Sequence, residues 1–141
     1  MKAFEIYYKQ IQVKKQLALQ SVAENQKQVK VAEERLAVLY RYQKEYAHDL
    51  EKVMQGGSTV NDFQYFLKFM AHLNKVVDDA KAYLAECIHQ QHELQQRYVH
   101  LKHESDELLL KIQKEANRER QVVQKKQEAQ LQDLYFMRGR R

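Results

Sequence analysis

The sequence predicts an all-α protein, namely a long antiparallel two-helix coiled-coil hairpin with unequal arms. The 141-residue chain has no proline, and two of its three glycines are adjacent at positions 56 and 57. Apolar residues recur at heptad spacing on both sides of this glycine pair, a pattern typical of helices that pack along one stripe. No internal duplication is visible, and we expect one domain over residues 1–141.

The first helix is expected at about residues 3–54. Alternating steps of four and three residues select 15 positions in this segment, and 12 of them are apolar. Such a stripe predicts a seam that is buried against another helix. The positions are Phe4, Tyr8, Ile11, Lys15, Ala18, Val22, Asn25, Val29, Ala32, Leu36, Leu39, Gln43, Tyr46, Leu50 and Val53.

A turn is expected at about residues 55–60. The adjacent glycines can adopt the left-handed backbone conformation that ends a helix. Ser58, Thr59 or Asn61 can then cap the next helix, because their side-chain oxygens accept hydrogen bonds from its free N–H groups. A short loop between two long amphipathic helices predicts an antiparallel pair.

The second helix is expected at about residues 61–137, with a seam that is strong as far as Ile112. Thirteen of 15 seam positions are apolar up to that point, and only three of the next seven. The strong positions are Phe63, Phe66, Met70, Leu73, Val77, Ala80, Leu84, Cys87, Gln91, Leu94, Tyr98, Leu101, Ser105, Leu108 and Ile112.

Folding the chain about the turn pairs residues whose numbers add up to about 115, which places Phe4 near Lys111. Residues after about 112 then have no partner in the chain and form an overhang, residues 112–141. The charge is uneven in the same way, because residues 1–110 hold 15 basic and 15 acidic side chains, whereas residues 111–141 hold nine and four. The net charge of +5 therefore resides in this C-terminal end.

The segment "LYRYQKEY", residues 39–46, concentrates three tyrosines in an otherwise glutamine-rich helix. The pairing brings it opposite a second apolar segment, so that side chains from both helices form one ridge on the g flank of the seam. The ridge consists of Tyr42, Phe69 and Val76, with Tyr83 as its extension, and the opposite flank carries Tyr40, Ala47 and Leu67. The tyrosines either cover the end of a narrow core or form a face that docks a partner protein.

The run "YRYQKEY", the glycine turn and "FLKFMAHL", with an aromatic residue 23 positions after Tyr46, resemble the FliJ family of the bacterial flagellar type III export apparatus. The resemblance implies a fold similar to the central-stalk gamma subunit of rotary ATPases. It also implies a patch near the turn that binds the cytoplasmic domain of the export gate protein. By position this patch falls on Leu39, Tyr42, Tyr46, Phe69, Leu73 and Val76, and the chain departs from the family pattern at its edges, Arg35 and Ala80.

The resemblance further implies that the paired N- and C-terminal helix ends enter the export ATPase hexamer and promote its assembly and activity. Family members also escort export chaperones. The basic overhang suits insertion into a ring, although such charges can equally be solvated on a helix face. The candidate contacts are Lys111, Lys114, Arg118, Arg120, Lys125 and Lys126, with Arg138, Arg140 and Arg141 beyond them.

No catalytic residue, cofactor or small-molecule substrate is expected. The glycine pair lacks the spacing and the lysine of a phosphate-binding loop. A single hairpin also cannot easily bring catalytic groups together from several directions. Histidines form two i,i+3 pairs, but these lie 11 residues or about 16 Å apart along a helix, too far to share one ion. No metal site is therefore expected. The residues weighed for it are Cys87, His89, His92, His100 and His103.

Three alternative functions stay open. The chain could be the equivalent stalk protein of a virulence injectisome, a chaperone-like scaffolding coiled coil, or a non-specific nucleic-acid binder that uses its basic end. Specific nucleic-acid recognition is not expected, because no reading motif is present. A single cysteine, an N-terminus without a secretory pattern and the lack of a long apolar run favour a cytoplasmic protein. We expect it to reach the cytoplasmic face of the inner membrane only through the export apparatus.

Overall fold

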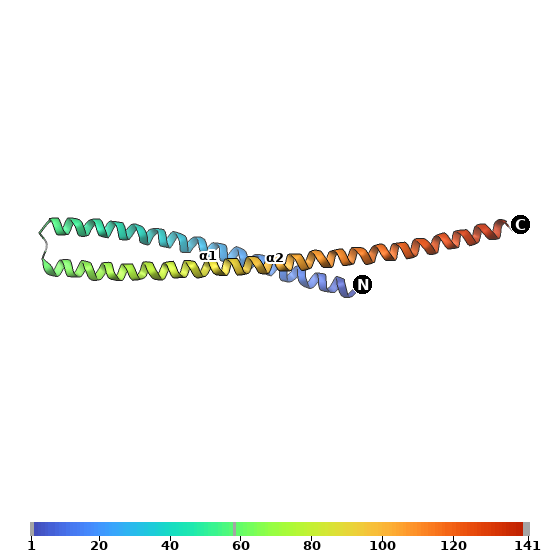
Figure 1. The fold of residues 1–141 in the computed structure, drawn as a ribbon, viewed down its shortest axis with the longest axis horizontal. Coiled ribbons are helices and arrows are strands. Elements are labelled where there is room, and N and C mark those ends of the chain that lie inside the picture. The colour runs from blue at the N-terminus through green and yellow to red at the C-terminus, as the bar shows by residue number, and fades with distance from the viewer. Residues whose placement is uncertain (1, 58, 140–141) are drawn as a thin grey trace. The chain divides into compact units, whose positions relative to one another are not determined.

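The computed structural model describes residues 2–57 and 59–139, which form two long helices joined by a turn. Helix α1 spans Lys2–Gln55 and helix α2 spans Val60–Gly139 (Figure 1). The two helices pack against each other, and the described residues contain no strand. The predicted all-α hairpin is confirmed, and each helix extends one or two residues beyond its expected range.

The turn between the helices uses one glycine and one threonine. Gly57 has a φ of 73°, the left-handed conformation that a side chain disfavours, and the N–H of Gly56 still donates to a carbonyl one helical turn back. Thr59 caps α2, because its Oγ1 accepts a hydrogen bond from the N–H of Asp62 at 3.3 Å. Of the other expected caps, Ser58 lies outside the described residues.

The chain forms two compact units, and each is described by itself. The turn unit comprises residues 19–96, and the terminal unit comprises the described residues 2–18 and 97–139. In each unit a stretch of α1 runs antiparallel to a stretch of α2, as the ribbon in Figure 1 shows. That residues 1–141 behave as a single domain stays a prediction.

The predicted seam forms the core of both units. All 15 seam positions of α1 and all 15 of α2 as far as Ile112 are buried or half-buried. A two-helix core is narrow, so few side chains are fully enclosed, and Val77 is the most deeply buried at 1% exposed. The buried apolar residues are Ala32, Leu36, Val29, Leu73, Val77 and Cys87 in the turn unit and Ile11, Ala18 and Leu101 in the terminal unit.

Side-chain contacts between the helices fix their register. They join residues whose numbers add up to between 112 and 121, which agrees with the predicted value of about 115. They connect Tyr46 to Phe69, Gln43 to Asn74, Asn25 to Cys87 and Tyr40 to Lys81 in the turn unit, and Gln12 to Ser105 and Phe4 to Lys111 in the terminal unit.

Candidate protein-docking surfaces

The side chains expected at the export gate all lie in the turn unit, but they differ in exposure. Tyr42 and Phe69 are exposed, at 45% and 37%. The side chains of Leu39, Tyr46 and Val76 are half-buried. Leu73 is only 7% exposed, so it belongs to the core and supports the surface from beneath.

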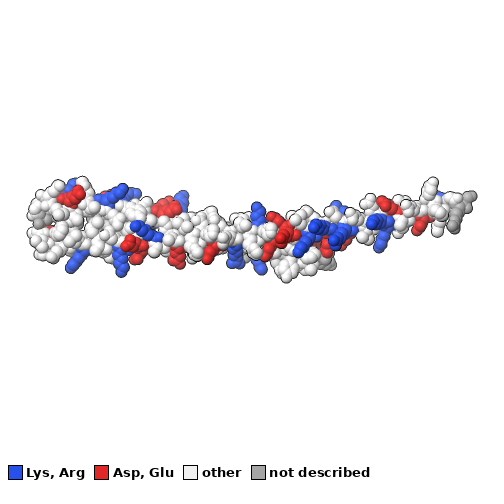
Figure 2. Space-filling model, viewed as in Figure 1, with Lys and Arg blue, Asp and Glu red and all other residues white. Residues whose placement is uncertain are grey.

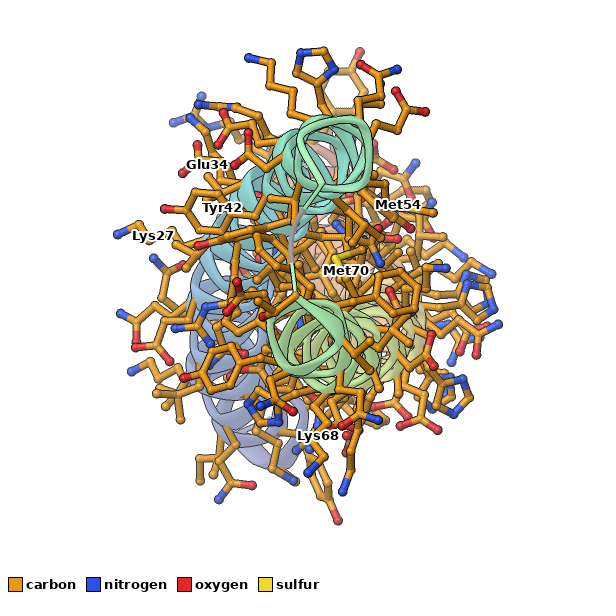
Figure 3. All side chains as sticks on the ribbon, turned by 90° about the vertical axis from the view of Figure 1, so that its left-hand side faces the viewer. Lys27, Glu34, Tyr42, Met54, Lys68 and Met70 are labelled. Atoms are coloured by element: carbon orange, nitrogen blue, oxygen red, sulfur yellow. The ribbon has the colours of Figure 1, made fainter. Side chains whose placement is uncertain are left out.

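Tyr42 and Phe69 lie on one flank of the seam, which we call the aromatic flank and define as the exposed Tyr42, Phe69 and Tyr83 with the half-buried Val76. Figure 3 shows Tyr42 pointing outward on one side of the hairpin and Met54 on the other, with Met70 between the helices. The ring of Phe69 is held in place from α1, because its centroid lies 4.6 Å from that of Tyr46 at an interplanar angle of 56°. Tilted aromatic pairs of this kind are attractive.

A groove continues the aromatic flank away from the turn. It has a volume of about 230 Å³ and an apolar floor that includes Leu39 and Val76. Tyr83 lines one wall and is 50% exposed. A side-chain hydrogen bond to Cys87, together with the charge of that group, raises the pKa of Tyr83, against a lowering effect of the Arg35 guanidinium. The full lining is Ala32, Arg35, Leu39, Val76, Asp79, Ala80 and Tyr83.

The opposite flank of the turn unit is bridged by polar contacts at the same level. The ammonium group of Lys81 lies 5.5 Å from the centroid of the Tyr40 ring, a cation–π contact. One turn closer to the loop, Nε2 of Gln43 donates to Oδ1 of Asn74 at 2.9 Å. At this level the opposite flank therefore carries polar contacts between the helices, whereas the aromatic flank carries the groove.

In the terminal unit, α2 continues past the last contact with α1. The ammonium group of Lys111 lies 6.0 Å from the centroid of the Phe4 ring, near the beginning of α1. Every residue of α2 from 117 to 139 is exposed, whereas Glu115 and Ala116 are still half-buried. The described part of the overhang thus presents more than six exposed helical turns that α1 does not cover.

The charges of the overhang are arranged by face. At about 100° per residue, five of the six candidate ATPase contacts fall within roughly 120° of the helix circumference, and Arg120 lies on the opposite side. Figure 2 shows basic side chains gathered along the first part of this stretch, with acidic ones among them. The five residues that share a face are Lys111, Lys114, Arg118, Lys125 and Lys126.

Some apolar side chains of the overhang recur at a spacing other than the heptad. Ile112, Val123 and Leu134 are 11 residues apart, the spacing that keeps a position on one face of a nearly straight α-helix. The side chains of Val123 and Leu134 are 54% and 59% exposed. Polar residues lie between them on the same face, so they form separate apolar contacts and no continuous stripe. An 11-residue search of the sequence would have found these positions.

The four histidines weighed as metal ligands lie on α2 and pair with polar side chains of the same helix. Three of them contact a glutamate four residues later, with nitrogen–oxygen distances of 2.9–3.1 Å and with side chains more than 40% exposed. Cys87 is buried in the seam. Among residues 2–57 and 59–139, no three His, Cys, Asp or Glu side chains are placed to hold a metal ion. The pairs are His89–Glu93, His100–Glu104 and His103–Glu107.

The fold and its exposed surfaces define the class of protein, a two-helix hairpin with an exposed aromatic flank near its turn and a C-terminal helical end that α1 does not cover. A family model identifies this class more narrowly. The chain belongs to the flagellar FliJ protein family, whose family model matches residues 3–138. No curated protein and no solved structure matches it. The predicted family membership is confirmed.

Family membership makes the chain a flagellar export-related protein of a non-catalytic family that works with the flagellar export apparatus. Neither helix, over the residues that the structure describes, has a stretch long and apolar enough to span a bilayer.

Proposed function

We propose that this protein is a central stalk of the flagellar export apparatus, with one docking surface in each unit. The terminal unit inserts the N- and C-terminal helix ends into the export ATPase hexamer and promotes its assembly and activity. The turn unit docks on the cytoplasmic domain of the export gate protein. The protein also escorts export chaperones, and it works in the cytoplasm at the cytoplasmic face of the inner membrane.

The observation that carries this proposal is the overhang. Residues 117–139 are exposed on every side, although this stretch carries large apolar side chains such as Leu131 and Tyr135, at 66% and 81%. Contiguous exposed apolar patches mark interaction sites in soluble proteins. The ATPase hexamer supplies a central hole in which all faces of one helix can be contacted, which suits a helix whose basic face and exposed apolar side chains lie on different sides.

The aromatic flank supports gate docking as the second part of the proposal. Tyr42 and Phe69 come from different helices and are both exposed in a glutamine-rich surrounding, and aromatic side chains are enriched at interface hot spots. Their backbones already lie in regular helices, so little conformational freedom is lost when a partner binds.

The test is hydrolysis by the flagellar ATPase in the presence of the full chain or of a chain that ends at Ala116. We expect the full chain to stimulate hydrolysis and hexamer formation, and the shortened chain to lose both effects while keeping its helical circular dichroism. The matched control is Phe69→Ala in the full chain, which leaves the overhang intact and should stimulate normally. Equal stimulation by the full and shortened chains would contradict the proposal.

Non-specific nucleic-acid binding is the rival function from another class. Four acidic side chains interleave with the basic ones between residues 111 and 139, which weakens attraction to phosphate backbones. This rival would be favoured if the full chain bound duplex DNA as tightly as it binds the ATPase at the same salt concentration.

A further inference from the structure

The beginning of α1, in the terminal unit, carries a second apolar row on the side of the helix that faces away from the seam. Ile6, Val13 and Leu17 follow one another at steps of seven and four residues, which keeps them within roughly 40° of the helix circumference. They are 57%, 61% and 57% exposed, whereas Ile11 and Ala18 on the other side of α1 are buried in the seam. This outer row therefore takes no part in the core.

Lysine side chains border the outer row on both sides. Lys9 lies about 60° around the helix from Ile6 in one direction and Lys14 about 80° in the other, and both are exposed. Tyr7, which is 61% exposed, lies next to Lys14 on the same border. Residues 2–18 hold four lysines and one glutamate, so this stretch is positively charged. We call the surface the basic amphipathic face, and it consists of Ile6, Tyr7, Lys9, Val13, Lys14 and Leu17.

The basic amphipathic face ends at Leu17. The next three positions on the same side of α1 are polar and exposed, namely Gln20, Glu24 and Gln28. Val31 follows on this side at 59% exposed, with polar and charged side chains around it. The face is thus about three helical turns long, and one exposed valine of the same helix lies outside it.

The kind of basic residue on α1 indicates what covers this face. Every basic residue of α1 before Arg35 is a lysine. Protein–protein interfaces are enriched in arginine and depleted of lysine. A lysine stem can instead lie along an apolar surface while its ammonium group reaches into a polar layer. A basic helix with an apolar row on the same side is typical of a helix that lies in the plane of an anionic membrane surface.

We propose that the basic amphipathic face binds the surface of a membrane that contains anionic lipids. The outer row enters the boundary between headgroups and acyl chains, and Lys9 and Lys14 contact lipid phosphates. Tyr7 lies at the level of the headgroups, where amphipathic rings are enriched in membrane proteins. The inference goes beyond the proposed stalk function, which gives the protein no lipid contact of its own.

Tryptophan fluorescence tests the location of the contact. The chain has no tryptophan, so a single introduced one reports only its own surroundings. Leu17→Trp places this reporter on the basic amphipathic face, and Val31→Trp places it on the same side of α1 outside the face. Each full-length variant is titrated with vesicles of equimolar phosphatidylglycerol and phosphatidylcholine, and with vesicles of phosphatidylcholine alone. We expect a blue-shifted emission from position 17 with the anionic vesicles only, and no shift from position 31.

Cosedimentation with the anionic vesicles tests the side chains. Val13→Gln should weaken binding about fivefold, because it removes an apolar side chain from the outer row. Lys9→Gln combined with Lys14→Gln should weaken binding about tenfold or more, since each basic residue near an anionic surface adds attraction. Circular dichroism shows whether each variant keeps its helicity, which substitutions at these exposed positions should leave unchanged.

The matched controls make the same chemical changes farther along α1. Val31→Gln replaces a valine of almost the same exposure as Val13, and Lys27→Gln with Lys30→Gln removes two exposed lysines. These lysines lie about 20 Å or more from Lys14 along the helix, beyond the screening length of about 8–10 Å. We expect both controls to bind the anionic vesicles within about twofold of the wild type.

Equal binding of Val13→Gln and Val31→Gln to the anionic vesicles would overturn the inference, and so would equal binding of the wild type to both kinds of vesicle. An emission shift from Leu131→Trp without one from Leu17→Trp would assign lipid binding to the overhang and overturn it as well. If the wild type bound no vesicles and Val13→Gln stimulated the flagellar ATPase less, the face would belong to the ATPase instead. The stalk function would then stand without a lipid contact.

Discussion

The rings of Tyr46 and Phe69 lie 4.6 Å apart between α1 and α2 and are separated by 23 positions in the sequence. Tyr46 is half-buried, whereas Phe69 keeps 37% of its surface exposed. The contact therefore presents a firmly held aromatic ring to the solvent. Within this cluster a half-buried ring stabilises the fold and exposed rings are available to a partner. Mutations can therefore test stability and binding separately.

Replacing Tyr46 should mainly affect stability, and replacing Tyr42 should mainly affect binding. Tyr46→Ala removes a half-buried ring and its contact with Phe69, so we expect a loss of about 1–3 kcal/mol in the free energy of unfolding. Tyr42→Ala removes an exposed ring, and the free energy of unfolding should change by less than about 0.5 kcal/mol. Urea unfolding followed by circular dichroism measures both.

The affinity for the export gate should depend on the exposed rings. We expect Tyr42→Ala to weaken binding to the gate's cytoplasmic domain by about tenfold or more at unchanged helicity, as for a hot-spot residue. Phe69→Ala should behave in the same way. Retained affinity in both variants would show that these rings only cover the end of the core.

The core holds one polar residue whose replacement should stabilise the protein. Asn25 is 3% exposed in the turn unit, its amide donates to the carbonyl of Cys87 at 3.2 Å, and its Oδ1 has no hydrogen-bond partner among the described residues. A buried acceptor without a partner costs free energy. We expect Asn25→Leu to raise the free energy of unfolding by about 1 kcal/mol.

Asn25→Leu should also make the pairing of the helices less specific, because a buried Asn in a seam specifies register and oligomeric state. Light scattering of Asn25→Leu should show added self-association at concentrations where the wild-type chain shows none. Gln43→Leu is the control, since Gln43 is half-buried and bonds to an exposed partner. Lower stability of Asn25→Leu would contradict this account of the polar position.

Gly57 should be the glycine least tolerant of substitution. Its φ of 73° is a conformation that a side chain disfavours by roughly 1–2 kcal/mol, although nothing lies within 4 Å of an added Cβ. Gly57→Ala should therefore lower the free energy of unfolding by about 1 kcal/mol. Gly139→Ala, in open space on α2, should cost nothing measurable. Equal melting temperatures of the two variants would argue against backbone strain at the turn.

Basic residues that share one face of the overhang should affect ATPase activity more than a basic residue on the opposite face. Replacing Lys114, Arg118 and Lys125 by Gln removes three charges from one face of α2, whereas Arg120→Gln removes one from the opposite face. We expect the triple variant to stimulate the flagellar ATPase at least several-fold less than Arg120→Gln, because clustered charges raise local attraction to a partner. Equal losses per charge removed would indicate that only net charge matters.

The seam, the register and the turn were predictable from the sequence because each depends on local spacing. Heptad positions identified Val77 and Ala32 as core residues, and the glycine pair located the turn. The groove between Arg35 and Asp79 was not predicted, because it depends on which side chains bridge the helices on either flank. Similarly, spacing placed Asn25 on the seam but could not show that one of its amide atoms would stay without a partner.

Site-specific photocrosslinking tests the central claim of two docking surfaces most directly. A photoreactive amino acid would replace either Lys125 on the overhang or Tyr42 on the aromatic flank, both exposed, in the presence of the export ATPase and the gate's cytoplasmic domain. The account predicts a crosslink to the ATPase from position 125 and to the gate domain from position 42. Crosslinks from both positions to the same partner, or the reverse assignment, would contradict it.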